Sequence, residues 1–265
     1  NVNGLLRKLS DRDFVSYICS FDFICLTETF MEHIQSDIFN GYKVFCKSAI
    51  KLTRQGRRSG GLVCLIKNEF VAFVKCLNIV NPNICIFMID KSLFGALKNI
   101  LLVCVYIPPE GSPFYNFFSG DNGIAMLEEC LVDCVVSLDD VDIIVCGDLN
   151  SRTANISCPI ETDTSTGDSQ AKSMSFCSNR YFEDSVVNNY GKLLLNMCAA
   201  LDLKILNGVC NGDLQGHYTY ISDGGCSVND YFLLSDNLFS LIFDSCHLFI
   251  AERTDSDHLP VELHI

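Results

Sequence analysis

The chain has 265 residues, of which 49% are hydrophobic, and a formal net charge of −13. This length and composition suit one large domain with two packed layers of sheet, so we expect a single domain over residues 1–265. The charge argues against a protein that coats nucleic acid through bulk electrostatics, because phosphate binding normally draws on a basic surface. The longest apolar runs, such as Asn99–Ile107, fall well short of the roughly 20 residues of a membrane helix. We therefore expect a soluble protein with no membrane partner.

The positive charge is concentrated in one stretch of the chain. No acidic residue lies between Ile38 and Asn68, and the basic residues there give this stretch +7 while the remainder carries −20. A polyanion can approach through such a stretch while carboxylates elsewhere hold a cation. The alternative is an ordinary solvated surface loop.

The sixteen cysteines favour a reducing compartment over a disulfide framework, because many of them lie inside apolar, strand-like runs. These are Cys25, Cys64, Cys85, Cys104 and Cys146. No CxxC pair occurs, and the closest spacing, Cys130 to Cys134, gives little support to a structural zinc site. We expect the cysteines to fill the core.

The predicted elements alternate between helices and short strands rich in β-branched and aromatic residues. In chain order they are a helix over 6–18, strands at Phe23–Leu26, Tyr42–Cys46, Gly61–Ile66, Phe70–Cys76, Ile84–Ile89 and Leu101–Tyr106, a helix within Gly123–Leu138, a strand at Asp142–Cys146, a helix over Leu193–Leu201, and strands at Tyr218–Ile221, Val228–Leu234, Leu248–Ala251 and Val261–Ile265. From Ser151 to Asn189 the chain is rich in Ser, Thr, Asn and Asp, which predicts a long polar loop insertion of unassigned role.

The most informative segment is DIIVCGDLN, Asp142–Asn150. A hydrophobic strand ends there in a glycine turn that presents Asp148 and Asn150 at the edge of a sheet, where ligands commonly bind. Asp148 can orient a water molecule while Asn150 donates to a phosphoryl oxygen. An Asx turn that caps the strand is the alternative interpretation.

A second segment, SDHLP at Ser256–Pro260, places Asp257 and His258 just before the last predicted strand. Imidazole can accept a proton or, once protonated, pair with an anionic phosphate. The other four histidines lack a comparable acidic and turn context. Asp230, in SVNDYFLL, is a candidate acceptor that would fix the His258 ring, although it can equally belong to a strand-start turn.

Two further polar residues end apolar runs. Glu28 closes FICLTET, where a carboxylate can ligate a hard cation, cap a helix or face solvent. Tyr106 ends LLVCVYIPP, whose two prolines force the chain into a loop. The phenol can donate to phosphate or simply pack.

Taken in order, these segments resemble the endonuclease/exonuclease/phosphatase superfamily. The closest resemblance is to the apurinic-endonuclease-like domain of LINE-type (non-LTR) retrotransposons, through NVNGL, TET, GGLVCLI, SVNDYFLLS and SDHLPVEL. The resemblance implies an α/β fold, a four-layer sandwich of two packed mixed sheets flanked by helices. It also implies an active site at one rim, where the strand ends converge.

The resemblance implies a role for each matching residue. Glu28, with Asn1 and Asp257, resembles the ligands of a Mg²⁺ ion, which Mn²⁺ can replace. Asp148 corresponds to the residue that orients or deprotonates the attacking water, and Asn150 is its partner. Tyr106 corresponds to a phosphate contact. His258 and Asp230 correspond to the pair that polarises the phosphate. The expected substrate contacts are Asn3, Thr219, Ser227, Arg54, Arg57 and Arg58.

Two features depart from the superfamily pattern. Asn3 stands where apurinic endonucleases tend to have an acidic metal ligand, which favours the retrotransposon branch over repair. The chain also starts directly at Asn1, so the resemblance implies that most of the first strand is absent, an N-terminally trimmed domain.

We therefore predict a Mg²⁺-dependent endonuclease that nicks DNA, leaves a 3′-hydroxyl and a 5′-phosphate, and primes reverse transcription. The partners implied are DNA and a reverse transcriptase domain of the same polyprotein, and the expected state is an intracellular monomer that acts in the nucleus. The alternatives are another phosphodiesterase or phosphatase of the superfamily, acting on RNA, lipid or inositol phosphate, and a non-catalytic domesticated transposon remnant that binds partners.

Overall fold

The computed structural model describes residues 1–34, 38–117, 122–156 and 180–265. Its centre is a six-stranded sheet in the order β4-β5-β6-β7-β11-β8. The strands are β4 Val74–Leu77, β5 Ile84–Ile89, β6 Asn99–Tyr106, β7 Val141–Asp148, β8 Leu203–Ile205 and β11 Asp230–Ser235. β6 and β7 run parallel and every other neighbouring pair runs antiparallel, so the sheet is mixed.

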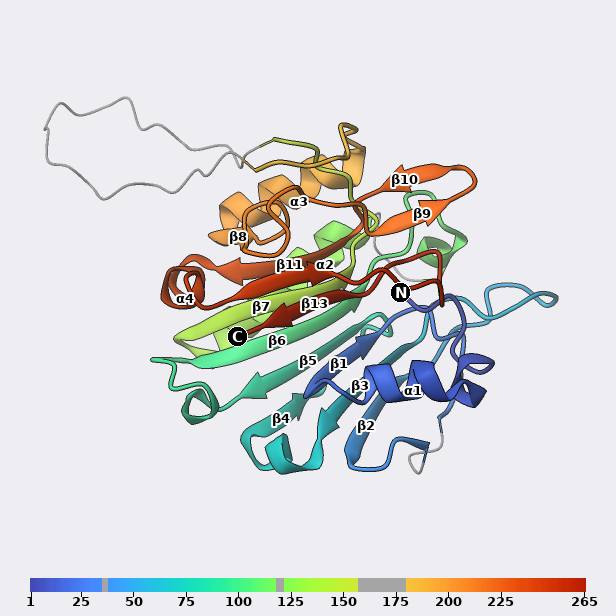
Figure 1. Cartoon of the computed structure of the whole chain (residues 1–265), viewed down its shortest axis with the longest axis horizontal. Helices are drawn as coiled ribbons and strands as arrows, with labels where there is room; N and C mark the ends of the chain where they lie inside the picture. The colour runs from blue at the N-terminus through green and yellow to red at the C-terminus, as the bar shows by residue number, and fades with distance from the viewer. Residues whose placement is uncertain (35–37, 118–121, 157–179) are drawn as a thin grey trace, which may run out of the picture.

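A second layer of strands packs on one face of this sheet (Figure 1). It contains an antiparallel sheet in the order β1-β3-β2, formed by β1 Phe23–Leu26, β3 Leu62–Lys67 and β2 Tyr42–Lys47. An antiparallel hairpin, β12 His247–Ile250 with β13 Val261–His264, lies in the same region. A groove of about 760 Å³ opens between β1 and β13, with Asn1 among the residues that line it.

Helices cover the outer faces of both layers. α2 Gly123–Leu138 and α3 Asn189–Ala200 bury apolar faces against β5, β6, β7 and β11. α1 Arg12–Ile18 packs through Phe14 and Ile18 on β1 and β3. α4 Asp236–Ile242 lies instead on the face of the six-stranded sheet opposite α2 and α3, where it packs on β7, β8 and β11. The predicted four-layer α/β sandwich is therefore confirmed. In the described part of the chain, every helix is too short or too polar to cross a membrane.

The strand predicted at Phe70–Cys76 was wrong in its first half. Residues Asn68–Phe73 form a 3-10 helix, and β4 begins only at Val74. The turn brings the ring of Phe70 onto that of Phe23, with 5.8 Å between ring centroids. Aromatic packing thus overrides the strand preference of this apolar run.

Three short elements, β8, α4 and β10 Gly225–Ser227, were not predicted. β10 pairs with β9 Tyr220–Ser222 in a small hairpin beside the main sheet. Strands of three residues, and a helix of seven such as α4, give too little periodicity for a sequence pattern to detect.

Helix α2 provides a test of the core. Leu131 is fully buried beneath the six-stranded sheet, whereas Val136 on the same helix is 74% exposed. We expect Leu131→Ala to lower the free energy of unfolding by about 2–5 kcal/mol through lost burial and a residual cavity. Val136→Ala should change it by less than about 0.5 kcal/mol. Urea unfolding of both variants measures the difference, and equal effects would contradict this packing.

Candidate active site

Three neighbouring strands bring their polar side chains to one edge of the six-stranded sheet. Tyr106, the last residue of β6, pairs in register with Asp148, the last residue of β7, and Asp148 pairs with Asp230, the first residue of β11. Gly147 has φ of +140°, and a Cβ at this position would lie 1.9 Å from the carbonyl oxygen of Val105. Only glycine therefore allows β7 to end here beside β6.

His258 joins the two aspartates in a buried cluster. Its Nδ1 lies 2.7 Å from Asp230 Oδ2, and its Nε2 lies 3.8 Å from Asp148 Oδ2. The chain before β13 is held in place by a backbone bridge between His258 and Tyr220, whose ring packs edge-on against the imidazole at 4.9 Å. All three members of the cluster are less than 9% exposed. Burial makes their mutual electrostatic interactions strong.

The cluster shifts the pKa values of its members in opposite directions. Burial, and next the negative charge of Asp230, raises the pKa of Asp148 to about 7. Burial alone would raise the pKa of Asp230 and lower that of His258, but their mutual attraction outweighs it and shifts each pKa the other way. Asp230 and His258 thus form an ion pair, and Asp148 can exchange a proton near neutral pH.

The first residues of the chain connect this cluster to Glu28. Asn1 donates from Nδ2 to Asp148 Oδ2 at 2.8 Å. Backbone hydrogen bonds from Val2 to Thr27 and from Gly4 to Glu28, 2.9 and 2.8 Å long, then lay this segment beside the end of β1. Glu28 itself has φ of +52°, a conformation costly for a non-glycine residue and frequent at functional sites.

Tyr106 contacts Glu28 directly, donating its hydroxyl hydrogen to Oε1. Burial, and then the nearby carboxylates of Glu28 and Asp148, raise the pKa of Tyr106 above its usual range. The phenol therefore stays neutral and remains a hydrogen-bond donor.

Two of the three residues predicted to hold a metal ion, Asn1 and Asp257, are joined through Asn3. Asn3 donates from its backbone to Asn1 Oδ1 at 3.0 Å and from its side chain to Asp257 Oδ1 at 3.2 Å. Together with Glu28, these groups offer carboxylate and carbonyl oxygens, the donors that Mg²⁺ prefers. The donor set therefore fits a hard divalent cation.

Asn150 adopts the turn geometry that the sequence had left as an alternative. Its φ is +47°, its backbone N–H donates to Asp148 Oδ1 at 3.0 Å, and its Nδ2 donates to the carbonyl of Ile107 at 2.8 Å. Asn150 thus fixes the orientation of the Asp148 carboxylate, and its amide retains a second hydrogen for another acceptor.

Thr219 and Ser227 lie behind the cluster and are buried. The Thr219 hydroxyl oxygen accepts hydrogen bonds from the backbone of Asn229 and Asp230, each 3.0 Å long. The carbonyl of Ser227 accepts from the backbone of Thr219. The structure therefore gives both residues contacts that support the start of β11.

The three arginines of the basic stretch differ in their surroundings. Arg57 stacks on the ring of Phe30 at 4.2 Å and donates to Asn3 Oδ1 at 3.2 Å, so it lies at the rim of the site. Arg58 pairs with Glu32, and Arg54 is exposed. The loop that carries these three arginines, the basic loop, projects from the side of the molecule where the N-terminus lies (Figure 1).

Sequence reasoning missed one ion pair that supports the site, in which the carboxylate is buried and the arginine is partly exposed. Arg152 donates from Nε and one terminal nitrogen to the Asp184 carboxylate at 2.8 and 2.6 Å. Asp184 also accepts from the backbone of Val228 at 3.1 Å, so it ties the chain after Asn150 to the chain before Asp230. Both partners belong to the predicted polar insertion, of which residues 157–179 lie outside the described residues. No local pattern distinguishes Asp184 from the other polar residues there.

Known structures share this architecture. The chain matches the endonuclease domain of TRAS1, a telomere-specific non-LTR retrotransposon, with 17% identity and a TM-score of 0.56 over 98% of this chain and 91% of that one. An AP endonuclease from Archaeoglobus fulgidus matches with 15% identity and a TM-score of 0.60 over 100% and 96%. The Xenopus laevis APE2 catalytic domain matches with 13% identity and a TM-score of 0.61 over 100% and 89%. A search of curated protein sequences found no match.

The fold and the strand-edge cluster define an enzyme of the endonuclease/exonuclease/phosphatase superfamily, a class of phosphodiesterases that depend on divalent metal ions. A family model described as endonuclease-reverse transcriptase matches residues 100–262, more than half of the chain. The chain belongs to this family.

Replacement of Asp184 tests its supporting role. Burial alone would raise the pKa of Asp184, but hydrogen bonds from Arg152 and from backbone N–H groups lower it. The stability that Asp184 contributes is therefore fully present above its pKa in the unfolded chain, about 3.9, and is lost as the pH falls through its lower pKa in the folded chain. We expect Asp184→Ala to cost about 1–3 kcal/mol near pH 7, because the buried backbone N–H of Val228 loses its acceptor and Arg152 loses its partner.

Unfolding measured by urea at pH 7 and at progressively lower pH checks both parts of this expectation. The exposed Asp133→Ala on α2 serves as a control, with an expected change of less than about 0.5 kcal/mol. The ion pair would be refuted by a difference in free energy of unfolding between wild type and Asp184→Ala that stays constant down to the lowest pH at which the protein folds.

Proposed function

We propose that this chain is a Mg²⁺-dependent endonuclease that nicks DNA and leaves a 3′-hydroxyl and a 5′-phosphate. The observation that carries the proposal is the buried Asp148–His258–Asp230 cluster beside an oxygen-rich donor set, in a chain of the endonuclease-reverse transcriptase family. The attacking nucleophile is water, because the cluster contains a group that can accept a proton from water, Asp148, and a group that can donate a proton to the phosphate, His258.

Each residue of the cluster has a role that its contacts support. Asp148 is held by hydrogen bonds from Asn1 and Asn150 and orients or deprotonates the attacking water. His258, kept protonated by Asp230, donates to a phosphate oxygen and stabilises the charge that develops on it. Asp230 fixes the ring through Nδ1, which leaves Nε2 directed at the reaction side.

The remaining residues bind the phosphate and the metal ion. Glu28, Asn1 and Asp257 would hold Mg²⁺, which when bound neutralises charge on the phosphate and leaving oxygens. Tyr106 keeps Glu28 oriented through its hydroxyl and contacts the phosphate or leaving group. Asn150 donates its second amide hydrogen to a phosphoryl oxygen.

DNA as substrate is supported by the family and by the basic loop around Arg54 and Arg57. The 3′-hydroxyl of the nick would prime reverse transcription by a domain of the same polyprotein, in the nucleus. TRAS1, whose endonuclease domain this chain resembles in fold, is itself a non-LTR retrotransposon.

Relaxation of supercoiled plasmid tests the activity. We expect nicking that requires Mg²⁺ and stops with EDTA, and we expect Asp148→Asn and His258→Ala to lower its rate about 10²–10⁴-fold, the usual contribution of a general acid or base. The exposed His264→Ala and Asp133→Asn should nick at the wild-type rate.

The assay also separates the alternatives. A phosphatase would release inorganic phosphate from small substrates, and a lipid phosphodiesterase would hydrolyse a lipid to a phosphomonoester and an alcohol. Both would leave the plasmid supercoiled, and a non-catalytic remnant would bind DNA without cutting it. Nicking that persists in both Asp148→Asn and His258→Ala would show that the activity does not come from this site.

Salt dependence of DNA binding tests the basic loop. Each phosphate contact contributes about 0.9 to the slope of log K against log salt on duplex DNA. We expect Arg54→Gln with Arg57→Gln to flatten the slope by up to about 1.8. Arg58→Gln should change it less, because Arg58 is already paired with Glu32.

Fluorescence anisotropy over a series of salt concentrations gives these slopes. Lys192→Gln, on the exposed face of α3, is the control for loss of a positive charge outside the basic stretch. If Lys192→Gln changes the slope as much as the two loop arginines do, the loop has no specific part in binding.

A further inference from the structure

A second group of metal-ligating side chains lies inside the sandwich, away from the rim. Cys25 of β1 pairs in register with Cys64 of β3. In the six-stranded sheet, Cys104 of β6 pairs with Cys85 of β5 on one side and with Cys146 of β7 on the other. Because the two layers pack face to face here, a pair of thiols on one sheet faces a row of thiols on the other.

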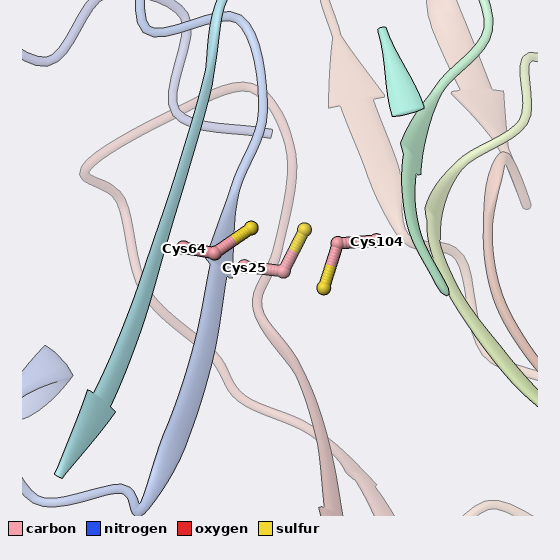
Figure 2. A group of neighbouring side chains, drawn as sticks. All are labelled: Cys25, Cys64 and Cys104. Atoms are coloured by element: carbon pink, nitrogen blue, oxygen red, sulfur yellow. The ribbon is translucent and has the colours of Figure 1, made fainter. Parts of the chain in front are cut away.

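The sulfur atoms of this group are close enough to share one ion. Those of Cys25, Cys64 and Cys104 all lie within 4.8 Å of one another, and Figure 2 shows the three side chains gathered between their strands. Cys104 Sγ also lies 3.9 Å from Cys146 Sγ. In a tetrahedral zinc site with Zn–S bonds of about 2.3 Å, the ligand sulfurs are about 3.8 Å apart. Three sulfurs therefore lie near this spacing already, and Cys146, beside Cys104, is the cysteine that can join them as the fourth ligand.

The surroundings allow an ion to enter. All four cysteines line the groove of about 760 Å³ between β1 and β13, whose lining also includes Asn1. A thiolate is the form in which cysteine binds a metal ion.

We propose that Cys25, Cys64, Cys104 and Cys146 form a Zn²⁺ site that links the two sheets of the sandwich. Binding replaces the thiol hydrogens by the ion and releases them as protons, with no change of oxidation state. Sulfur ligands between the two sheets select a soft cation, whereas the rim offers oxygen ligands to a hard one. The ligands come from four separate strands, so the missing CxxC spacing does not count against this site.

Cobalt substitution tests the proposal on the whole chain. Reduced protein, stripped with EDTA, is titrated with Co²⁺ and then with Zn²⁺. We expect one equivalent of Co²⁺ to give thiolate-to-metal charge-transfer absorption and tetrahedral d–d bands, which Zn²⁺ abolishes. Cys104→Ala and Cys64→Ala should lose the bands, while Cys198→Ala, an equally buried cysteine of α3, should keep them. Asp148→Asn, which alters only the rim cluster, should also keep them.

X-ray absorption at the zinc edge of the wild-type protein decides the question if the cysteine variants fail to fold. A first shell of sulfur at about 2.3 Å supports the site. A first shell of nitrogen and oxygen, or bands that persist in Cys104→Ala and vanish in Asp148→Asn, would place the ion at the rim and overturn the proposal. Neither result depends on whether the chain nicks DNA.

Discussion

The contact of one imidazole with two buried carboxylates constrains this whole edge of the molecule. Asp148 and Asp230 face each other in register on neighbouring strands, where two negative charges shielded from water would repel strongly. His258 resolves the conflict by pairing with Asp230, and Asp148 then carries the raised pKa. The segments that meet here, the start of the chain, the glycine turn after β7 and the loop before β13, are all held by hydrogen bonds to this cluster or beside it.

The sequence predicted well those features that depend on local pattern. The bounds of β1, β5 and α2 followed directly from apolar runs and helical spacing, and Glu28, Asp148 and His258 stood out because each ends or precedes such a run. Features that depend on distant contacts were not predictable. The 3-10 helix at Asn68–Phe73 forms where Phe70 packs on a ring 47 positions earlier in the chain, and Asp184 gains its role only from partners on either side of it in the fold.

Oxygen and sulfur ligands are segregated in the fold. Carboxylate and amide groups stand at the strand ends, where the chain turns and water has access, whereas thiols stand in mid-strand between the two sheets. This separation would direct a hard cation to the rim and a soft one to the interior. The charge is also unevenly placed, because this acidic chain carries three arginines in a loop at the rim, where Arg57 contacts Asn3.

The origin of the oxygen atom added during cleavage tests the central claim most directly. If Asp148 and His258 activate water against the phosphorus atom, nicking a synthetic duplex in H₂¹⁸O must place one ¹⁸O in the new 5′-phosphate, and the 3′-end must remain a hydroxyl that a polymerase can extend. Mass spectrometry of the two product strands measures both. Nicked product with a 3′-phosphate, or a 5′-phosphate without ¹⁸O, would contradict the account.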